Sequence, residues 1–148
     1  MAHSLFPIDP SQIITGFTTL PSISLPHITH VPLNDKTLGV HKVWNRTTHE
    51  VVTPPPPTTH PHDTRDKAWL ASFPAGSINP GNKSAPPGGF GFYVHGPKEF
   101  HERMKEEKPR EVVMGYEVMF EDGFGWVLGG KLPGVCTYPS SLSQLLVF

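Results

Sequence analysis

Apolar and polar residues alternate along three segments in the second half of the chain, residues 90–94, 111–120 and 126–133. Because successive side chains of a strand point to opposite faces, alternation of period two predicts β-strands with one buried face. The apolar faces consist of these residues: Phe90, Phe92 and Val94; Val112, Met114, Tyr116, Val118 and Phe120; Trp126, Leu128 and Leu132. The opposite faces are emptier or more polar, which is typical of antiparallel sheets packed as a sandwich.

The emptier faces carry the residues that are free to meet a ligand. Tyr93 shares its face with Gly91, and Glu117 lies on the polar face of its segment with Glu111. Lys131 follows two glycines and precedes Leu-Pro-Gly, so the two residues before it on its strand have no side chains. A lysine in that position contributes little to a core, and it suits a strand that presents a cation to a ligand lying across a sheet.

One helix is expected, over residues 98–108. Pro97 is tolerated in the first turn of a helix, and Pro109 ends the pattern. Two pairs of side chains stand one turn apart on this segment: Glu99 with Arg103, and Phe100 with Met104. The mixed charge leaves no basic face, so the segment is interpreted as a surface helix that links two strands. The turn between the second and third strands is predicted at Glu121-Asp122-Gly123.

The chain divides into four sections. Residues 1–53 contain short apolar pieces, such as Ile13-Ile14 and Leu38-Gly39-Val40, whose spacing favours short strands of the N-terminal part of a sandwich. Residues 54–66 are a proline-rich linker or loop that neither a helix nor a central strand can cross. Residues 67–135 form the expected β-sandwich core, and residues 136–148 are an atypical tail that we expect to have no defined place in the sandwich.

Composition excludes several classes of protein. With 148 residues the chain is long enough for one domain, and its formal net charge of −1 gives no footprint for nucleic acid. No apolar run approaches the ~18 residues of a transmembrane helix, so no membrane partner is expected. The first residues lack a basic and an apolar region of a secretory signal, which makes the cytoplasm the default location. A single cysteine, Cys136, excludes an internal disulfide framework.

The second half of the chain resembles the fungal branch of polysaccharide lyase family 14, which includes alginate and glucuronate-polymer lyases. The resemblance is carried by these residues: Trp69, 71–77 (ASFPAGS), 79–81 (NPG), 88–93 (GGFGFY), 112–120 (VVMGYEVMF) and 129–134 (GGKLPG). It implies an all-β, concanavalin-like jelly-roll sandwich with one short helix and a concave substrate-binding sheet. It also implies an acidic polysaccharide as partner, no cofactor, and secretion in many members.

The resemblance implies a lyase that cleaves a uronate polymer by β-elimination. Such an enzyme neutralises the C6 carboxylate, removes the C5 proton and protonates the leaving oxygen. By the resemblance, Lys131 is the catalytic residue. Tyr93 and Glu117, on the emptier faces of their strands, are expected to bind substrate. Tyr116 alternates with the core residues and is expected to be packed.

Other interpretations of these residues stay open. Lys131 suits an exposed edge strand, where lysines discourage aggregation. Glu111 and Glu117 are six residues apart on one strand, too far for the carboxylate pair of a glycosidase. His60-x-His62 and His27-x2-His30 lie in irregular stretches without the further ligands of a zinc site, and no metal is expected. Cys136 has no recognisable base beside it.

The sequence of the tail, residues 136–148, affects whether lyase activity is expected. The family places further arginine and tyrosine residues on strands downstream of the GGKLPG motif, and residues 136–148 do not resemble those strands. The sandwich is therefore expected to be incomplete, truncated at its C-terminus. Two functions stay open: a polysaccharide lyase, active or inactive through truncation, and a non-catalytic carbohydrate-binding β-sandwich fragment.

Overall fold

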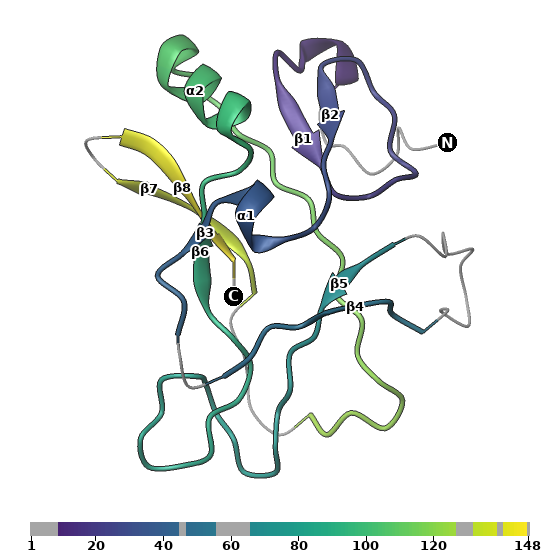
Figure 1. Ribbon diagram of the computed structural model, residues 1–148, viewed down its shortest axis with the longest axis vertical. Coiled ribbons are helices and arrows are strands. Elements are labelled where there is room, and N and C mark those ends of the chain that lie inside the picture. Colours follow the sequence, from purple (N-terminus) through teal and green to yellow (C-terminus); the bar gives the residue numbers. More distant parts are fainter. Residues whose placement is uncertain (1–8, 45–46, 56–65, 127–131, 139–140, 148) are drawn as a thin grey trace.

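Short strands make up most of the regular structure. The computed structural model describes residues 9–44, 47–55, 66–126, 132–138 and 141–147. Its strands form three small sheets (Figure 1). The strands are β1 Gly16–Thr18, β2 Ile28–His30, β3 Val40–His41, β4 Val51–Val52, β5 Ala68–Trp69, β6 Phe92–Val94, β7 Gly134–Tyr138 and β8 Ser141–Val147. The helices are η2 Pro10–Gln12, α1 Asp35–Leu38 and α2 Lys98–Glu107. This content agrees with the all-β class, while the jelly roll stays a prediction.

The largest sheet has the strand order β3-β6-β8-β7, and every pair in it is antiparallel. β8 comes from the tail and lies between β6 and β7, with Phe92 opposite Val147 and Tyr93 opposite Leu146. The expectation that the tail has no defined place is therefore wrong for the residues that the structure describes. The apolar run Leu145-Leu146-Val147 suits a central strand, but no sequence pattern upstream indicated which strand it would join.

The core forms on one face of β6. Phe90, Phe92 and Val94 are buried, as their alternation predicted, and Phe92 is only 1% exposed. The rings of Phe90 and Phe92 stack with centroids 5.2 Å apart. Trp69 of β5 meets Phe92 edge-on at 4.8 Å, an arrangement that aromatic quadrupoles favour. Leu38 of α1 and Val31 complete the buried cluster.

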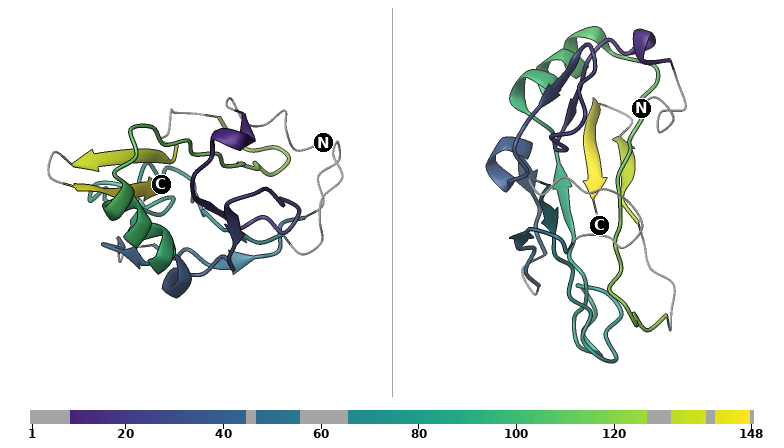
Figure 2. Two further views of the ribbon diagram at one scale, coloured as in Figure 1. Left: turned by 90° about the horizontal axis from the view of Figure 1, so that it is seen from above. Right: turned by 90° about the vertical axis from the view of Figure 1, so that its right-hand side faces the viewer.

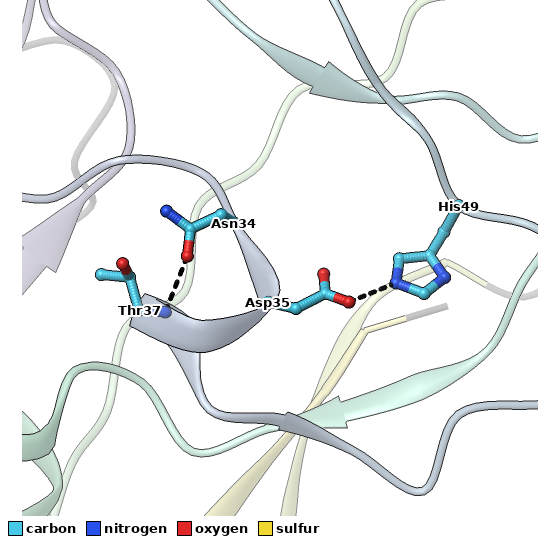
Figure 3. A network of polar contacts seen from close by, with 4 residues as sticks. All are labelled: Asn34, Asp35, Thr37 and His49. Atoms are coloured by element: carbon cyan, nitrogen blue, oxygen red, sulfur yellow. Dashed lines mark hydrogen bonds and ion pairs between the residues drawn. The ribbon is translucent and has the colours of Figure 1, made fainter.

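Helix α1 leads directly into the central sheet. The Asn34 side chain accepts a hydrogen bond from the Thr37 backbone N–H at 2.8 Å, which caps the first turn (Figure 3). Gly39 ends the helix in the left-handed conformation, with φ of 60°, and the chain continues as β3. Asp35 accepts a hydrogen bond from His49 Nε2 at 2.9 Å, and the His49 ring packs on Phe92 at 4.9 Å. α1 is thus fixed to the segment before β4 as well as to β3.

The predicted helix is confirmed as α2. It begins after Pro97, and Lys108, with φ of 44°, follows its last residue. Arg103 pairs with Glu107 at 2.6 Å rather than with Glu99, the partner that the spacing suggested. Phe100 packs edge-on against Phe17 of β1 at 5.0 Å, so the apolar stripe of the helix faces the β1–β2 sheet. Figure 1 and the right-hand view of Figure 2 both place α2 beside that sheet.

The remaining short strands come from the first half of the chain and from β5. β1 and β2 pair in parallel, with Phe17 opposite Thr29, and β4 pairs antiparallel with β5. The expected strand at Ile13-Ile14 is not formed, and in Leu38-Gly39-Val40 only Val40 is in a strand because Leu38 ends α1. Most of the proline-rich section, residues 56–65, lies outside the described residues. Within the described ranges no helix is long and apolar enough to cross a membrane.

The predicted strand at residues 111–120 is not assigned in the structure. This segment belongs to none of the three sheets, and its expected core face is open, with Val118 48% and Phe120 42% exposed. Tyr116, which we expected to be packed, is 45% exposed. Alternation defines two faces but supplies no partner strand, and none of the described strands pairs with this one. The third predicted strand falls largely on residues 127–131, outside the described residues.

The turn after this segment is confirmed. The Phe124 backbone N–H donates to the Glu121 carbonyl at 3.1 Å, and Gly123 has φ of 79°. A positive φ at the third residue is what a type II turn requires, and glycine adopts it without steric cost. The rings of Phe120 and Trp126 meet across the turn at 4.4 Å, and Phe124 joins them.

Removal of the most buried ring tests the core. Phe92→Ala should lower the free energy of unfolding by about 3–5 kcal/mol, because it leaves a cavity under Trp69 and His49. Urea denaturation followed by tryptophan fluorescence measures the loss. Phe120→Ala, which truncates a ring that is 42% exposed, is the matched control and should cost less than half as much. Equal losses would contradict the assignment of the core to β6.

The open apolar segment should promote self-association. Val113, Val118 and Met119 are 42%, 48% and 50% exposed, and exposed runs of apolar residues promote association between chains. The double substitution Val118→Ser and Met119→Ser should reduce the concentration-dependent increase in light scattering. Lys105→Ser with Glu106→Ser, on the exposed surface of α2, should leave it unchanged. Scattering that is low and independent of concentration in the unsubstituted chain would contradict this prediction.

Candidate functional site

The predicted site residues lie in different surroundings. Tyr93 is in β6 and is half-buried, on the face of the strand opposite Phe92 and Val94. Glu117 is exposed on the segment that belongs to no sheet, so no strand register places it beside Tyr93. Lys131 lies outside the described residues. The site is therefore built here outward from Tyr93.

Tyr93 is flanked by an imidazole and an ammonium group from β3 and its end. The β3–β6 register sets His41 opposite Tyr93, and the two ring centroids are 5.8 Å apart. Lys42 Nζ lies 4.8 Å from the centroid of the tyrosine ring, within the range of a cation–π interaction. The contact stabilises an ammonium group above the ring and holds it on the Tyr93 side of the sheet.

A backbone irregularity allows His41 and Lys42 to reach the same ring. In an extended strand their side chains would point to opposite faces of the sheet. Lys42 has φ of 50°, in the left-handed region, so the alternation is broken at the end of β3. A residue with a Cβ atom disfavours this conformation by about 1–2 kcal/mol. Strain of this kind is found where the surrounding structure requires a side chain at a particular place.

Two further histidines extend the group. His95 follows Tyr93 by two residues, and its ring stacks on that of His41 with centroids 4.0 Å apart and an interplanar angle of 9°. His101 of α2 meets His95 edge-on at 4.8 Å. We use the name Tyr93 face for His41, Lys42, Tyr93, His95 and His101 together. Gly39 lies close to it, because a Cβ atom there would make a tight contact of 3.3 Å with Cβ of His95 and its φ of 60° disfavours a side chain.

The hydrogen bond of His41 fixes its tautomer. Nδ1 lies 3.0 Å from the Gly39 carbonyl, which can only accept, so Nδ1 carries the hydrogen and donates it. In the neutral ring the lone pair is then on Nε2. That atom is buried and has no hydrogen-bond partner among the described residues. This hydrogen bond thus fixes the orientation of the His41 ring within the Tyr93 face, with its acceptor atom buried.

A positive charge on His101, at the α2 edge of the Tyr93 face, is unfavourable. Burial lowers the pKa of His101 below its ordinary value, and the positive charges of Lys105 and His95 lower this pKa further, while Glu102 partly opposes them. His101 therefore favours the neutral form in the folded state. The face combines a phenol, an ammonium group and imidazoles, which are groups that transfer protons and stabilise developing negative charge.

Sequence reasoning found Tyr93 but missed its neighbours. His95 was visible as the next residue on the same face of the strand, two positions beyond Tyr93. His41 and Lys42 carried no signal, because their proximity depends on the pairing of β3 with β6, more than 50 residues apart in sequence. The contact of His101 with His95 depends on the orientation of α2, which the sequence did not indicate.

The other candidate sites find no support in the described geometry. His27 and His30 are both exposed, and His60 and His62 lie outside the described residues. In the part of the chain that the structure describes, no group of three histidine, cysteine or acidic residues is placed to hold a metal ion. Glu111 is exposed on the same unpaired segment as Glu117.

Comparison with protein families gives one match. The model of the family described as Polysaccharide lyase 14 matches residues 61–143, which is more than half of the chain. The matched range contains Tyr93, His95, His101, Glu117 and Lys131, whereas His41 and Lys42 precede it. The chain matches no curated protein and no solved structure.

The lowered pKa of His101 predicts how stability depends on pH. The folded state holds a proton on His101 less readily than the unfolded state. The contribution of His101 to stability is therefore fully present above the ordinary histidine pKa of about 6.5. It is lost as the pH falls below that value, through the lower pKa of the folded state. The melting temperature should therefore fall between pH 7.5 and pH 5, and His101→Gln should reduce the fall. An identical pH profile for this variant would contradict the assignment.

Proposed function

The chain belongs to the polysaccharide lyase 14 family, and from this we propose that it cleaves a uronate-containing polysaccharide by β-elimination. The family match is the observation that carries the proposal, since it covers the segment with Lys131 and the strand with Tyr93. The substrate class follows from the chemistry. Elimination needs an acidic proton next to a carboxylate, and a uronate unit has one at C5.

The proposed reaction moves one proton off the sugar and one onto it. The C5–H bond breaks, its electron pair becomes the C4–C5 double bond, and the C4–O bond to the leaving sugar breaks. Lys131 accepts the C5 proton as the base, and the positive charge that it then carries stabilises the negative charge developing on the C6 carboxylate. Tyr93 supplies a proton to the leaving oxygen. The overall elimination requires no oxidant and no cofactor.

The Tyr93 face supports a role for Tyr93 in this reaction. The chain has a net charge of −1, so overall charge does not attract an acidic polymer, and local cations have to do so. Lys42 supplies one such cation 4.8 Å from the tyrosine ring. Glu117, exposed on its segment, is proposed to accept hydrogen bonds from sugar hydroxyls.

A non-catalytic carbohydrate-binding role is the second candidate. It is favoured by the position of Glu117, which is exposed on a segment outside the three sheets that the structure describes. A protein of this kind would bind the polymer without producing a double bond.

The ultraviolet absorbance of the C4–C5 double bond tests the proposal. Glucuronate- or mannuronate-rich polymers should yield this absorbance, and a neutral glucan should not. Lys131→Ala should reduce the rate at least ~100-fold, the contribution of one positioned acid–base group, and Tyr93→Phe should act similarly. Lys131→Arg should also be slow if the lysine is the base, because a guanidinium does not lose its proton.

The control is Lys83→Ala, which removes an exposed lysine from the loop before β6 and should leave the rate unchanged. Full activity in Lys131→Ala would show that this lysine is not catalytic. Binding of uronate polymers without any product would favour the non-catalytic role.

A further inference from the structure

A groove lies between the β1–β2 sheet and helix α2, with a volume of about 310 Å³. We propose that this groove is a saccharide subsite that holds one pyranose unit of a polysaccharide through its hydroxyl groups. The subsite rests on the proposed function, because it would bind the polymer on which the Tyr93 face acts. Its size lies at the lower end of the ~300–1,000 Å³ of ligand pockets, which suits one sugar unit.

The apolar part of the groove is a pair of aromatic rings. Phe17 and Phe100 meet edge-on with centroids 5.0 Å apart and an interplanar angle of 72°. Both rings lie directly on Gly96, where a Cβ atom would come within 2.9 Å of each. Gly96 also has φ of 81°, so only glycine fits there without strain. The rings are thereby held in a fixed position, and fixed aromatic rings suit the C–H surface of a pyranose.

Polar groups surround these rings. The β1–β2 register sets Thr29 opposite Phe17, so a hydroxyl group lies on the same side of the sheet as the ring. Glu99 and Arg103 line the groove from successive turns of α2. Arg103 donates to Glu107 through Nε and Nη2, which leaves the hydrogens on Nη1 for a ligand.

The balance of these charges indicates which part of a sugar is recognised. The Glu99 carboxylate offers an acceptor and the Nη1 hydrogens of Arg103 offer donors, while Glu107 already pairs with the guanidinium, so the groove has no net positive charge. A uronate carboxylate therefore gains no net electrostatic attraction from these side chains. Hydroxyl groups donate and accept at once, so they suit this pair, and the subsite should bind neutral and acidic sugars alike.

A strained histidine at the groove gives independent support. Leu25, Pro26, His27 and Ile28 form a turn in which the Ile28 N–H donates to the Leu25 carbonyl at 3.2 Å. His27 lines the groove and has φ of 63°, at the turn position where glycine or asparagine is favoured. The strained turn thus places an imidazole side chain at the groove, where glycine would leave none.

Helix α2 connects the groove to the Tyr93 face. Phe100 contacts Phe17 in the groove, and the next residue, His101, contacts His95 of the Tyr93 face. The right-hand view of Figure 2 shows α2 beside the β1–β2 sheet. The two sites therefore adjoin the same turn of the helix.

Calorimetric titration of the whole chain with two oligosaccharides tests the subsite. The probes are a tetramer of glucuronate and a neutral glucan tetramer. Glu99→Ala should weaken the binding of both about tenfold, the effect of losing one hydrogen bond to a charged group. Glu102→Ala is the matched control, since Glu102 is an exposed glutamate of the same helix outside the groove, and it should bind as the unsubstituted chain does.

His27→Gly separates binding from folding. Relief of the strained φ should leave the melting temperature unchanged or higher, while the affinity for both tetramers should fall several-fold. Equal affinities for Glu99→Ala and Glu102→Ala, or no binding of either tetramer, would overturn the subsite. Elimination product with unchanged affinity in Glu99→Ala would leave the lyase intact and remove only the subsite. Weaker binding in Glu99→Ala without any product would retain the subsite and remove the lyase.

Discussion

The packing of one face of β6 determines what its other face can do. Phe92 and Val94 are 1% and 2% exposed, and they are held by Trp69, Leu38 and the stacked ring of Phe90. Because side chains alternate along a strand, this burial forces Tyr93 and His95 outward. A shift of register by one residue would place the tyrosine in the core and a phenylalanine in the site. The chemistry of the Tyr93 face is thus a consequence of hydrophobic packing on the opposite side.

Gly39 connects the helix cap, the sheet and the site. Its carbonyl accepts hydrogen bonds from His41 Nδ1 and from the backbone N–H of His95, so one backbone group contacts both of these residues. Its own N–H donates to the carbonyls of Asp35 and Lys36 in α1. The same residue has to be glycine for two reasons, its positive φ and the close approach of His95. The position of the imidazoles therefore depends on where α1 ends.

The sequence allowed prediction of features that depend on neighbours along the chain. The buried face of β6, helix α2 and the turn at Gly123 follow from alternation, proline and glycine positions. Features that depend on distant segments could not be predicted. The alternation in residues 111–120 indicated two faces but not whether a strand would pair with them, and the structure pairs none. The place of β8 beside β6 and of His41 beside Tyr93 likewise depends on contacts between distant segments. The roles of Lys131 and Glu117 remain predictions.

The glycines that carry the family resemblance have a physical role in this structure. Trp44 lies on two of them, and a Cβ atom would approach its ring to 2.7 Å at Gly81 and 2.8 Å at Gly91. Phe73 lies in the same way on Gly89, at 2.9 Å. Phe73 also contacts Phe124 at 6.3 Å, which joins the loop before β6 to the aromatic turn after residue 120. A side chain at these glycines would push the rings away, so the glycine-aromatic motif is a packing motif. The motif therefore accounts for packing and not for chemistry, so the catalytic roles proposed for Lys131 and Tyr93 need support of their own.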